Sequence, residues 1–216
     1  MRKTIKITLC LALLLILSIT AFAYERAYVS CDVLNVRVSP NTECDIIKQV
    51  RTNTPVDIIY TTDTGWCSVL FEDNTTGFVS ARYLKMENEI NSSIAGNQIA
   101  EDAYKYLGCR YVYGTEGPNT FDCSGFTSFL YKKYGYTLPR ASYSQASVGR
   151  YIEKEKLKAG DLLFFSNSST NNIGHVGIYV GGGEFIHAST SNRGVVKDSL
   201  SSDYYVRHYI TARRIV

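Results

Sequence analysis

The hydrophobic period changes once along this 216-residue chain, near residue 98, and the change limits the folds available to it. Residues 24–86 carry short runs in which apolar and polar side chains alternate, as in half-buried strands. From Ile99 the apolar residues recur with helical spacing instead. We therefore expect a small all-β domain at residues 24–86 and an α+β domain at residues 98–216. The polar residues 87–97 between them are interpreted as a linker.

The first domain carries three short motifs in order, spread over about 60 residues. Its regular short strands and polar turns favour a small barrel. The motifs resemble those of the bacterial SH3-like domain found on cell-wall enzymes, so the resemblance implies that fold. They are Leu34-Asn35-Val36-Arg37, Gly65-Trp66 and Gly77-Phe78-Val79.

Two helices and then several strands are expected in the second domain. Ile99, Ala103, Tyr106 and Leu107 form one helical stripe, which Gly108 ends. A second helix runs from residue 123 to Gly135. The later segments are rich in strand-forming residues, and residues 181–183, all glycine, are expected to turn a hairpin. Helices followed by an antiparallel sheet make an α+β plan.

The first 23 residues have the pattern of an export signal. Three basic residues precede an apolar run, and Ala21-Phe22-Ala23 fits a cleavage site before Tyr24. An uncleaved anchor is the alternative. Cleavage predicts a secreted or cell-envelope protein without a transmembrane segment. It also removes three positive charges, so the net charge of +3 becomes 3 − 3 = 0. A neutral chain argues against a nucleic-acid partner.

Five of the six cysteines lie after the predicted cleavage site, and export permits disulfides. The odd number leaves one thiol free or in an intermolecular link, and Cys123 is the candidate for the free one. A bridge between Cys31 and Cys44 is the most local pairing; three connectivities are open. The alternative is that Cys31, Cys44, Cys67 and Cys109 are all small buried apolar residues. No C-x-x-C occurs, so we expect neither a metal nor another cofactor.

The stretch FDCSGF sets Cys123 at the start of a helix. The free N–H groups and dipole of a helix N-terminus favour an anion, and the thiolate is the nucleophilic form of cysteine. Ser124 and Gly125 are small, which leaves the sulfur reachable. The position suits a reactive thiolate.

A thiolate that attacks an amide needs a proton carrier, and histidine serves best near neutral pH. His175 and His187 lie on the two arms of the glycine hairpin, seven and five residues from Gly182. We expect both on one side of the sheet, one touching Cys123 and the other orienting the first. His208 is expected to be a surface or packing residue.

The motifs DCSGF, AGDLLFF, GHVGIYVGGGEFIHAS and YVYG closely resemble those of NlpC-type cell-wall cysteine peptidases, which have a compact papain-like fold. The resemblance runs from Ile99 to the C-terminus. It implies that Cys123 is the nucleophile, His175 the base and His187 the third, orienting residue. It also implies an oxyanion site at the backbone amide of Cys123, with Tyr111 lining the active site.

The resemblance further implies a substrate, the stem peptide of peptidoglycan, cut between γ-D-glutamate and the diamino acid. In SH3-bearing members the amino end of L-Ala is held by residues that match Asp122, Ser124 and Ser142. The alternatives are a helix cap for Asp122 and ordinary polar surface for the serines. The family often has Pro before the tyrosine and two glycines after it, in the pattern Tyr-x-x-Gly-Gly. Here Arg110 stands in place of the Pro and Thr115 in place of the second Gly, so the cleft rim is expected to differ.

The leading hypothesis is a secreted, monomeric γ-D-glutamyl-diamino acid endopeptidase that works through a thioester acyl-enzyme. One alternative is an N-acetylmuramoyl-L-alanine amidase, or another amide hydrolase or transferase with the same machinery. Another is a non-catalytic wall-binding protein. The SH3-like domain either binds wall glycopeptide or narrows the cleft to stems with a free L-Ala amine. Whether the diamino acid is diaminopimelate or lysine stays open.

Overall fold

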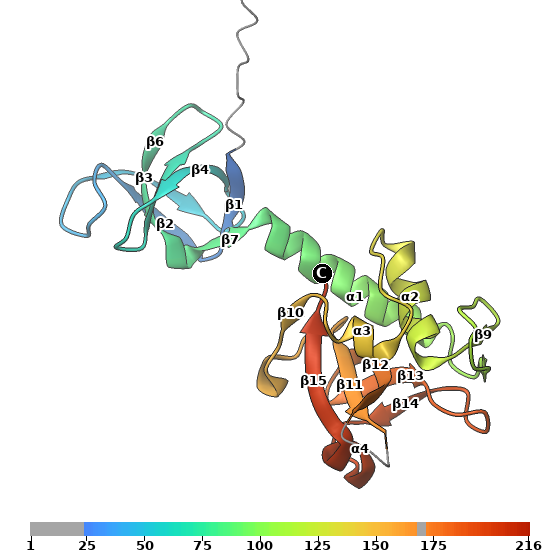
Figure 1. Ribbon diagram of the computed structural model, residues 1–216. Helices are drawn as coiled ribbons and strands as arrows, with labels where there is room; N and C mark the ends of the chain where they lie inside the picture. The colour runs from blue at the N-terminus through green and yellow to red at the C-terminus, as the bar shows by residue number, and fades with distance from the viewer. Residues whose placement is uncertain (1–23, 168–171) are drawn as a thin grey trace, which may run out of the picture. The chain divides into compact units, whose positions relative to one another are not determined.

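The computed structural model describes residues 24–167 and 172–216, and the chain divides into two compact units after Leu84 (Figure 1). The predicted export signal, residues 1–23, lies outside the described residues. Among those described, no helix has the length and apolar content that a membrane crossing requires.

The first unit is all β, as predicted. Leu34 and Val36 are buried on one side of β2, whereas Val38 lies beyond the strand and is exposed. The strands join one sheet in the order β3-β2-β6-β5-β4-β1-β7. The elements are β1 Glu25–Val29, β2 Val33–Arg37, β3 Ile46–Arg51, β4 Pro55–Thr61, β5 Trp66–Leu70, β6 Thr76–Ser80, η1 Ala81–Tyr83 and β7 Leu84–Met86.

The second unit is α+β, also as predicted, with its later strands in orange and red after the green and yellow helices of Figure 1. Its elements are α1 Glu87–Tyr104, β8 Arg110–Tyr111, β9 Thr120–Phe121, α2 Cys123–Lys133, α3 Ser142–Gln145, β10 Arg150–Tyr151, η2 Lys154–Lys156, β11 Leu162–Ser166, β12 Ile173–Gly181, β13 Glu184–Ala188, β14 Val195–Ser199, α4 Asp203–His208 and β15 Tyr209–Arg214.

Six antiparallel strands form the main sheet of this unit, in the order β10-β15-β11-β12-β13-β14. The predicted hairpin is present between β12 and β13. Gly181, Gly182 and Gly183 all have positive φ, a conformation that glycine adopts without steric cost. This turn makes β12 and β13 neighbours, which matters for the site because each carries one histidine.

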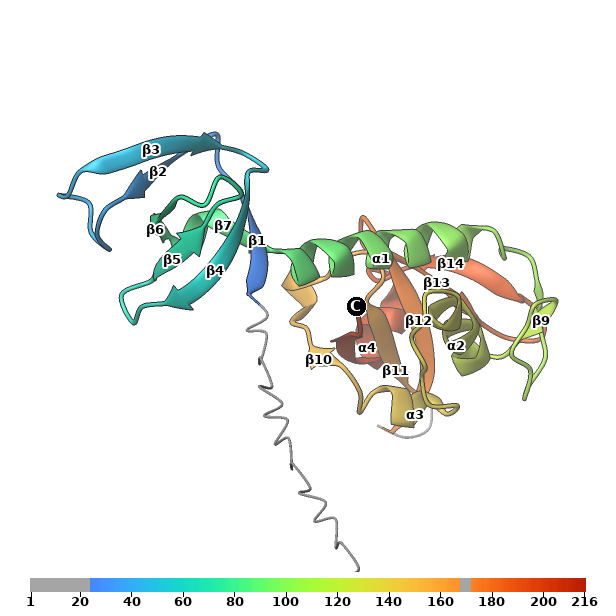
Figure 2. The ribbon, with the colours of Figure 1, turned by 90° about the horizontal axis from the view of Figure 1, so that it is seen from above.

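The two faces of the sheet pack against different helices. Phe164 of β11 belongs to a buried cluster with Phe126 of α2, on the face that α1, α2 and α3 cover. Figure 2 shows α1 running alongside this sheet. Phe165, the next residue of β11, points the other way and packs with Tyr205 of α4. Burying each phenylalanine stabilises the fold by about 1.5–3 kcal/mol.

The segment interpreted as a linker is helical, because α1 begins at Glu87 and continues to Tyr104. Its first turns are polar and mostly exposed, so they lack the apolar stripe by which a helix is detected in sequence. Gly96 is buried where a Cβ would lie 2.8 Å from the carbonyl oxygen of Ala159. The helix ends before Leu107, which is exposed rather than part of the predicted stripe.

The predicted bridge between Cys31 and Cys44 is wrong. Both thiols are free, as are those of Cys67, Cys109 and Cys123. The sulfur of Cys31 lies 3.5 Å from the carbonyl oxygen of Val33, and that of Cys44 lies 3.3 Å from the carbonyl oxygen of Ser39. The alternative of four buried apolar cysteines holds only for Cys67, because Cys31, Cys44 and Cys109 are partly exposed.

Candidate active site

Helix α2 begins at Cys123 and is capped by the preceding residue, Asp122. One oxygen of the Asp122 carboxylate accepts the backbone N–H of Gly125 at 2.7 Å, which satisfies one of the free donors of the first turn. A Cβ on Gly125 would lie only 2.1 Å from the carbonyl oxygen of Thr115. Gly125 is therefore required by the close approach of the preceding loop, rather than by access to the sulfur.

The sulfur of Cys123 lies against strand β12. Hydrogen bonds from the backbone of Ser124 and Val176 lower the pKa of the thiol, and Val176 directly follows His175. Burial and the charge of Asp122 act the other way, and the net pKa lies above the ordinary value of 9.0. This differs from the expected thiolate: the helix N-terminus is present, but desolvation outweighs it. The resting group is a neutral thiol.

His175 and His187 share one face of the sheet, as the hairpin spacing predicts. Ile178 pairs with Ile186 across the two strands. The two histidines are three and one residues from that pair, so both project from the opposite face. Nε2 of His175 lies 2.6 Å from Nδ1 of His187.

Both imidazoles are neutral in the resting protein. Burial, together with the neighbouring His187, lowers the pKa of His175 from the ordinary 6.5 to about 3. His187 is fully buried, and burial also lowers its pKa, although Asp198 works in the opposite direction. The site therefore rests as a thiol beside neutral imidazoles, and proton transfer must accompany attack by the sulfur.

Asp198 is a site residue that the sequence reasoning missed. Its Oδ2 lies 3.0 Å from Nε2 of His187. The side chains of Arg193 and Tyr205 also donate hydrogen bonds to this oxygen. Asp198 lies on β14, paired with Phe185 of β13. Val196 of β14 pairs with His187, and alternate residues of a strand share a face. The position of Asp198 two residues after Val196 was the sequence signal that could have placed it beside His187.

Tyr111 and Ser142 both lie on elements that contact the start of α2 or β12. Strand β8, which ends at Tyr111, pairs with β9, which ends one residue before Asp122. Burial, with the nearby Cys123 and Asp122, raises the pKa of the Tyr111 hydroxyl, so it remains a donor. Ser142 is buried at the start of α3, a helix that packs on α2 and β12.

Asp122 and Ser124 are both bonded to Arg140. Nη1 of Arg140 lies 3.0 Å from Oδ1 of Asp122 and 2.9 Å from Oγ of Ser124, and Nη2 bonds to Oδ2. Gly114 donates its N–H to the same carboxylate. Arg140 also pairs through Nε with Glu116 at 3.0 Å. The Asp122 carboxylate is thus well supplied with donors, and its pKa is lowered.

Gln145 fastens α3 to α2 and was not foreseen either. Its amide is fully buried, and Nε2 donates to the backbone oxygens of Ser124 and Pro139 and to Oγ of Ser128. Oε1 accepts from Thr127 at 2.8 Å. These bonds hold Ser142 and its helix beside the residue that follows Cys123.

His208 stands apart from the pair. It is the last residue of α4 rather than part of a strand, and its ring stacks on Tyr204 with centroids 4.1 Å apart. This is the expected packing role. Within residues 24–167 and 172–216, no group of three or more His, Cys, Asp or Glu side chains is placed to hold a metal ion.

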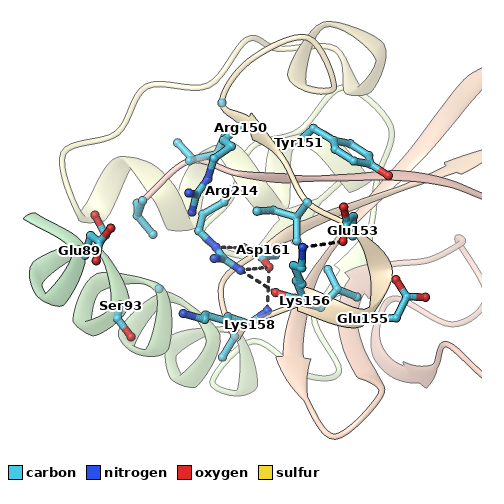
Figure 3. Close-up of a pocket in the computed structure, with 18 of the residues that line it drawn as sticks. Glu89, Ser93, Arg150, Tyr151, Glu153, Glu155, Lys156, Lys158, Asp161 and Arg214 are labelled. Atoms are coloured by element: carbon cyan, nitrogen blue, oxygen red, sulfur yellow. Dashed lines mark hydrogen bonds and ion pairs between the residues drawn. The ribbon is translucent and has the colours of Figure 1, made fainter. Parts of the chain in front are cut away.

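A cavity of about 470 Å³ opens beside His175. It is lined by His175, Arg193 and Asp198, together with hydroxyl groups of nearby serine, threonine and tyrosine residues. A larger cavity of about 1040 Å³ lies between α1 and β10, around the ion pair of Asp161 and Arg214 (Figure 3). Cys123, His175 and His187 are all absent from the lining of the larger cavity, and of the three only His175 lines the smaller one.

Two family models match the chain: the NlpC/P60 family over residues 108–214 and the bacterial SH3 domain over residues 32–85.

Two relatives are each 34% identical to the chain. The "Murein DD-endopeptidase MepS/Murein LD-carboxypeptidase" of Escherichia coli matches over 65% of this chain and 74% of its own length. The "Gamma-D-glutamyl-L-lysine dipeptidyl-peptidase" of Bacillus cereus matches over 61% of this chain and 40% of its own.

A crystal structure of an NlpC/P60 family protein from Bacillus cereus superposes with a TM-score of 0.54 and 28% identity, covering 89% of this chain and 63% of that one. The fold, the order of motifs and these similarities agree. The chain belongs to the NlpC/P60 family of cysteine peptidases and carries a bacterial SH3 domain ahead of the family's domain.

Proposed function

We propose that the chain hydrolyses peptidoglycan as a cysteine endopeptidase that cleaves the bond between γ-D-glutamate and the diamino acid of stem peptides. The observation that carries the proposal is the position of Cys123. Cys123 begins α2, and its sulfur lies against the backbone of Val176. Val176 directly follows His175, whose ring contacts that of His187. The Bacillus cereus relative, named for a γ-D-glutamyl-L-lysine activity, supports the choice of bond.

In the proposed mechanism, Cys123 attacks the carbonyl carbon of γ-D-glutamate while its proton passes to His175. The developing oxyanion accepts hydrogen bonds from the backbone N–H of Cys123, which has no acceptor within the helix, and from the Tyr111 hydroxyl. His175 then returns the proton to the departing amine. A water molecule, activated by His175, hydrolyses the thioester and frees the enzyme.

The proposal includes recognition of a free L-Ala amine by Asp122, Ser124 and Ser142. Arg140 competes with that amine for the Asp122 carboxylate. The guanidinium of Arg140 occupies the face of Asp122 that an ammonium group would need. Arg140 also bonds to Glu116, which is partly exposed. We infer that a substrate amine takes the place of Arg140 on Asp122 while Arg140 keeps its contact with Glu116.

The test is a digest of L-Ala-γ-D-Glu-diaminopimelate, with its amino end free or acetylated, followed by mass spectrometry. Release of diaminopimelate from the free form alone, and none with Cys123→Ala, is the expected result. Cleavage of both forms would keep the peptidase and remove the amine requirement. A folded protein that cleaves neither would contradict the proposal.

A second candidate activity is cleavage of another amide bond in the wall. The Escherichia coli relative is named for a DD-endopeptidase and an LD-carboxypeptidase activity. An amidase, a transferase or a non-catalytic wall-binding protein are further alternatives. The product masses from cross-linked and uncross-linked muropeptides distinguish these bonds. We propose a cell-envelope location, for which the export-signal pattern of residues 1–23 argues, and a monomeric state.

A further inference from the structure

The two site histidines are the first members of a longer chain of contacts that ends at a carboxylate. Nε2 of His175 meets Nδ1 of His187 at 2.6 Å, and Nε2 of His187 meets Oδ2 of Asp198 at 3.0 Å. The three side chains come from β12, β13 and β14, three neighbouring strands. A side chain on the third strand thus reaches the proposed base through one intervening ring.

Asp198 is held as a carboxylate by the groups around it. Arg193 donates from Nη1 to Oδ2 and from Nη2 to Oδ1, each at 2.7 Å. The hydroxyl of Tyr205 lies 2.9 Å from Oδ2 and donates to it. The hydrogen bond from His187, together with those from Arg193 and Tyr205, holds the pKa of Asp198 well below its ordinary range. An ionised carboxylate can only accept hydrogen bonds.

An acceptor at one end of the chain determines the direction of every bond in it. His187 must carry its hydrogen on Nε2 to donate to Asp198, so its Nδ1 presents a lone pair. That lone pair faces Nε2 of His175, which must therefore carry the hydrogen of that ring. The hydroxyl of Tyr205 donates its hydrogen bond to Asp198. Its oxygen lies 3.2 Å from Nε2 of His187 and can therefore only accept from that nitrogen. The remaining ring nitrogen, Nδ1 of His175, is left without a hydrogen.

We propose that Asp198 is a positioning residue that fixes the tautomers of His187 and His175, leaving Nδ1 of His175 free to take the proton of Cys123. The proposal rests on the proposed function, in which His175 is the base. In the step it prepares, the S–H bond of Cys123 breaks and its electron pair stays on sulfur. The proton forms an N–H bond at Nδ1 of His175. The opposite tautomer would present an N–H to the thiol and block this step.

The tautomers can be read directly in the unmodified two-domain protein by ¹⁵N nuclear magnetic resonance of its histidine rings. The chain has only three histidines, and His208→Gln assigns the one outside the site. At neutral pH, the expected result is an Nε2–H tautomer for both His175 and His187. An Nδ1–H tautomer at His175 in the wild-type protein would overturn the proposal without any variant.

The matched variants are Asp198→Asn and Asp161→Asn. Asp161 is also a buried carboxylate, bonded at 2.7 Å by two nitrogens of Arg214, but no contact joins it to either site histidine (Figure 3). Asp198→Asn removes the obligate acceptor, so we expect mixed tautomers at the two rings. Its kcat should fall about 10–100-fold with little change in KM. Asp161→Asn should keep both tautomers and kcat while losing thermal stability.

The outcomes separate this proposal from the function on which it rests. Cleavage by the wild type, none by Cys123→Ala, and full activity with Asp198→Asn would overturn the positioning role and leave the peptidase intact. Expected tautomers in a protein that cleaves no stem peptide would overturn the function alone. If Asp198→Asn fails to fold, Tyr205→Phe, which removes one donor to Asp198, should still shift the ring signals of His187. Unshifted signals would count against the proposal.

Discussion

A Cβ atom placed on Gly177 would lie 3.0 Å from Cβ of His187 and 2.8 Å from a ring carbon of Phe185. Gly177 belongs to the GHVG stretch of β12, two residues after His175. Its missing side chain leaves the space that the ring of His187 needs beside that of His175. The glycine is therefore part of the geometry of the histidine pair.

Gly177→Ala is expected to displace His187 and lower kcat by about tenfold or more, because small misplacements of catalytic groups are costly. The control is Gly182→Asn at the hairpin tip. Gly182 has φ of +62°, which asparagine tolerates, and no atom within 4 Å of a Cβ. Steady-state cleavage of a stem peptide measures both variants. Equal activity of Gly177→Ala and wild type would contradict the prediction.

Alkylation of Cys123 by iodoacetamide should accelerate as pH rises, with a midpoint above 9.0. The thiolate is the reacting form, and burial together with Asp122 raises the pKa above that ordinary value. The thiolate fraction is thus small at neutral pH and grows on the alkaline side. Peptide mass spectrometry distinguishes Cys123 from the other free cysteines. A rate already constant between about pH 5 and 7 would instead indicate a resting thiolate–imidazolium pair.

Gln145→Met should lower the free energy of unfolding of the second unit by about 1–3 kcal/mol, since it removes the buried hydrogen bonds that join Gln145 to α2 and to Pro139. Calorimetry measures the change, and the fluorescence of the single tryptophan, Trp66, follows the first unit separately. Gln98→Met, at an exposed position of α1, is the control and should stay within about 0.5 kcal/mol. A shift no larger than that of the control would show that the buried amide adds nothing.

Arg140→Gln tests the competition at Asp122. We expect a KM that is about threefold lower or more for the stem peptide with a free amine, and still no cleavage of the acetylated one. The physical reason is that the ammonium no longer has to displace a cation from the carboxylate. Thermal stability should fall, because Asp122 is buried and loses a partner.

Glu116→Gln is the matched opposite of that change. It removes the second partner of Arg140, so Arg140 should stay on Asp122 and KM for the free amine should rise. If Arg140→Gln and Glu116→Gln each have the same KM as the wild type, the amine binds at a site other than Asp122.

The second-domain elements near Cys123 were predictable because their signals are local. A helix with its cysteine at the first position, a glycine hairpin and period-two strands can each be read within about 15 residues. The helical structure of residues 87–97 was not predictable, because the first turns of α1 are polar and mostly exposed. The Cys31–Cys44 bridge failed because proximity in sequence is not proximity of sulfur atoms.

The sequence by itself determined the order of the elements, the nucleophile candidate and the parity that sets His175 and His187 on one face. Tertiary structure decided which groups these residues meet. Asp198 reaches His187 through strand pairing, and Arg140 reaches Asp122 across 18 positions of chain. Tertiary structure also decided the charge state of Cys123, since burial outweighs the helix N-terminus. Hydrophobic period and turn residues act locally, whereas ion pairs and desolvation depend on contacts that form only when the chain is packed.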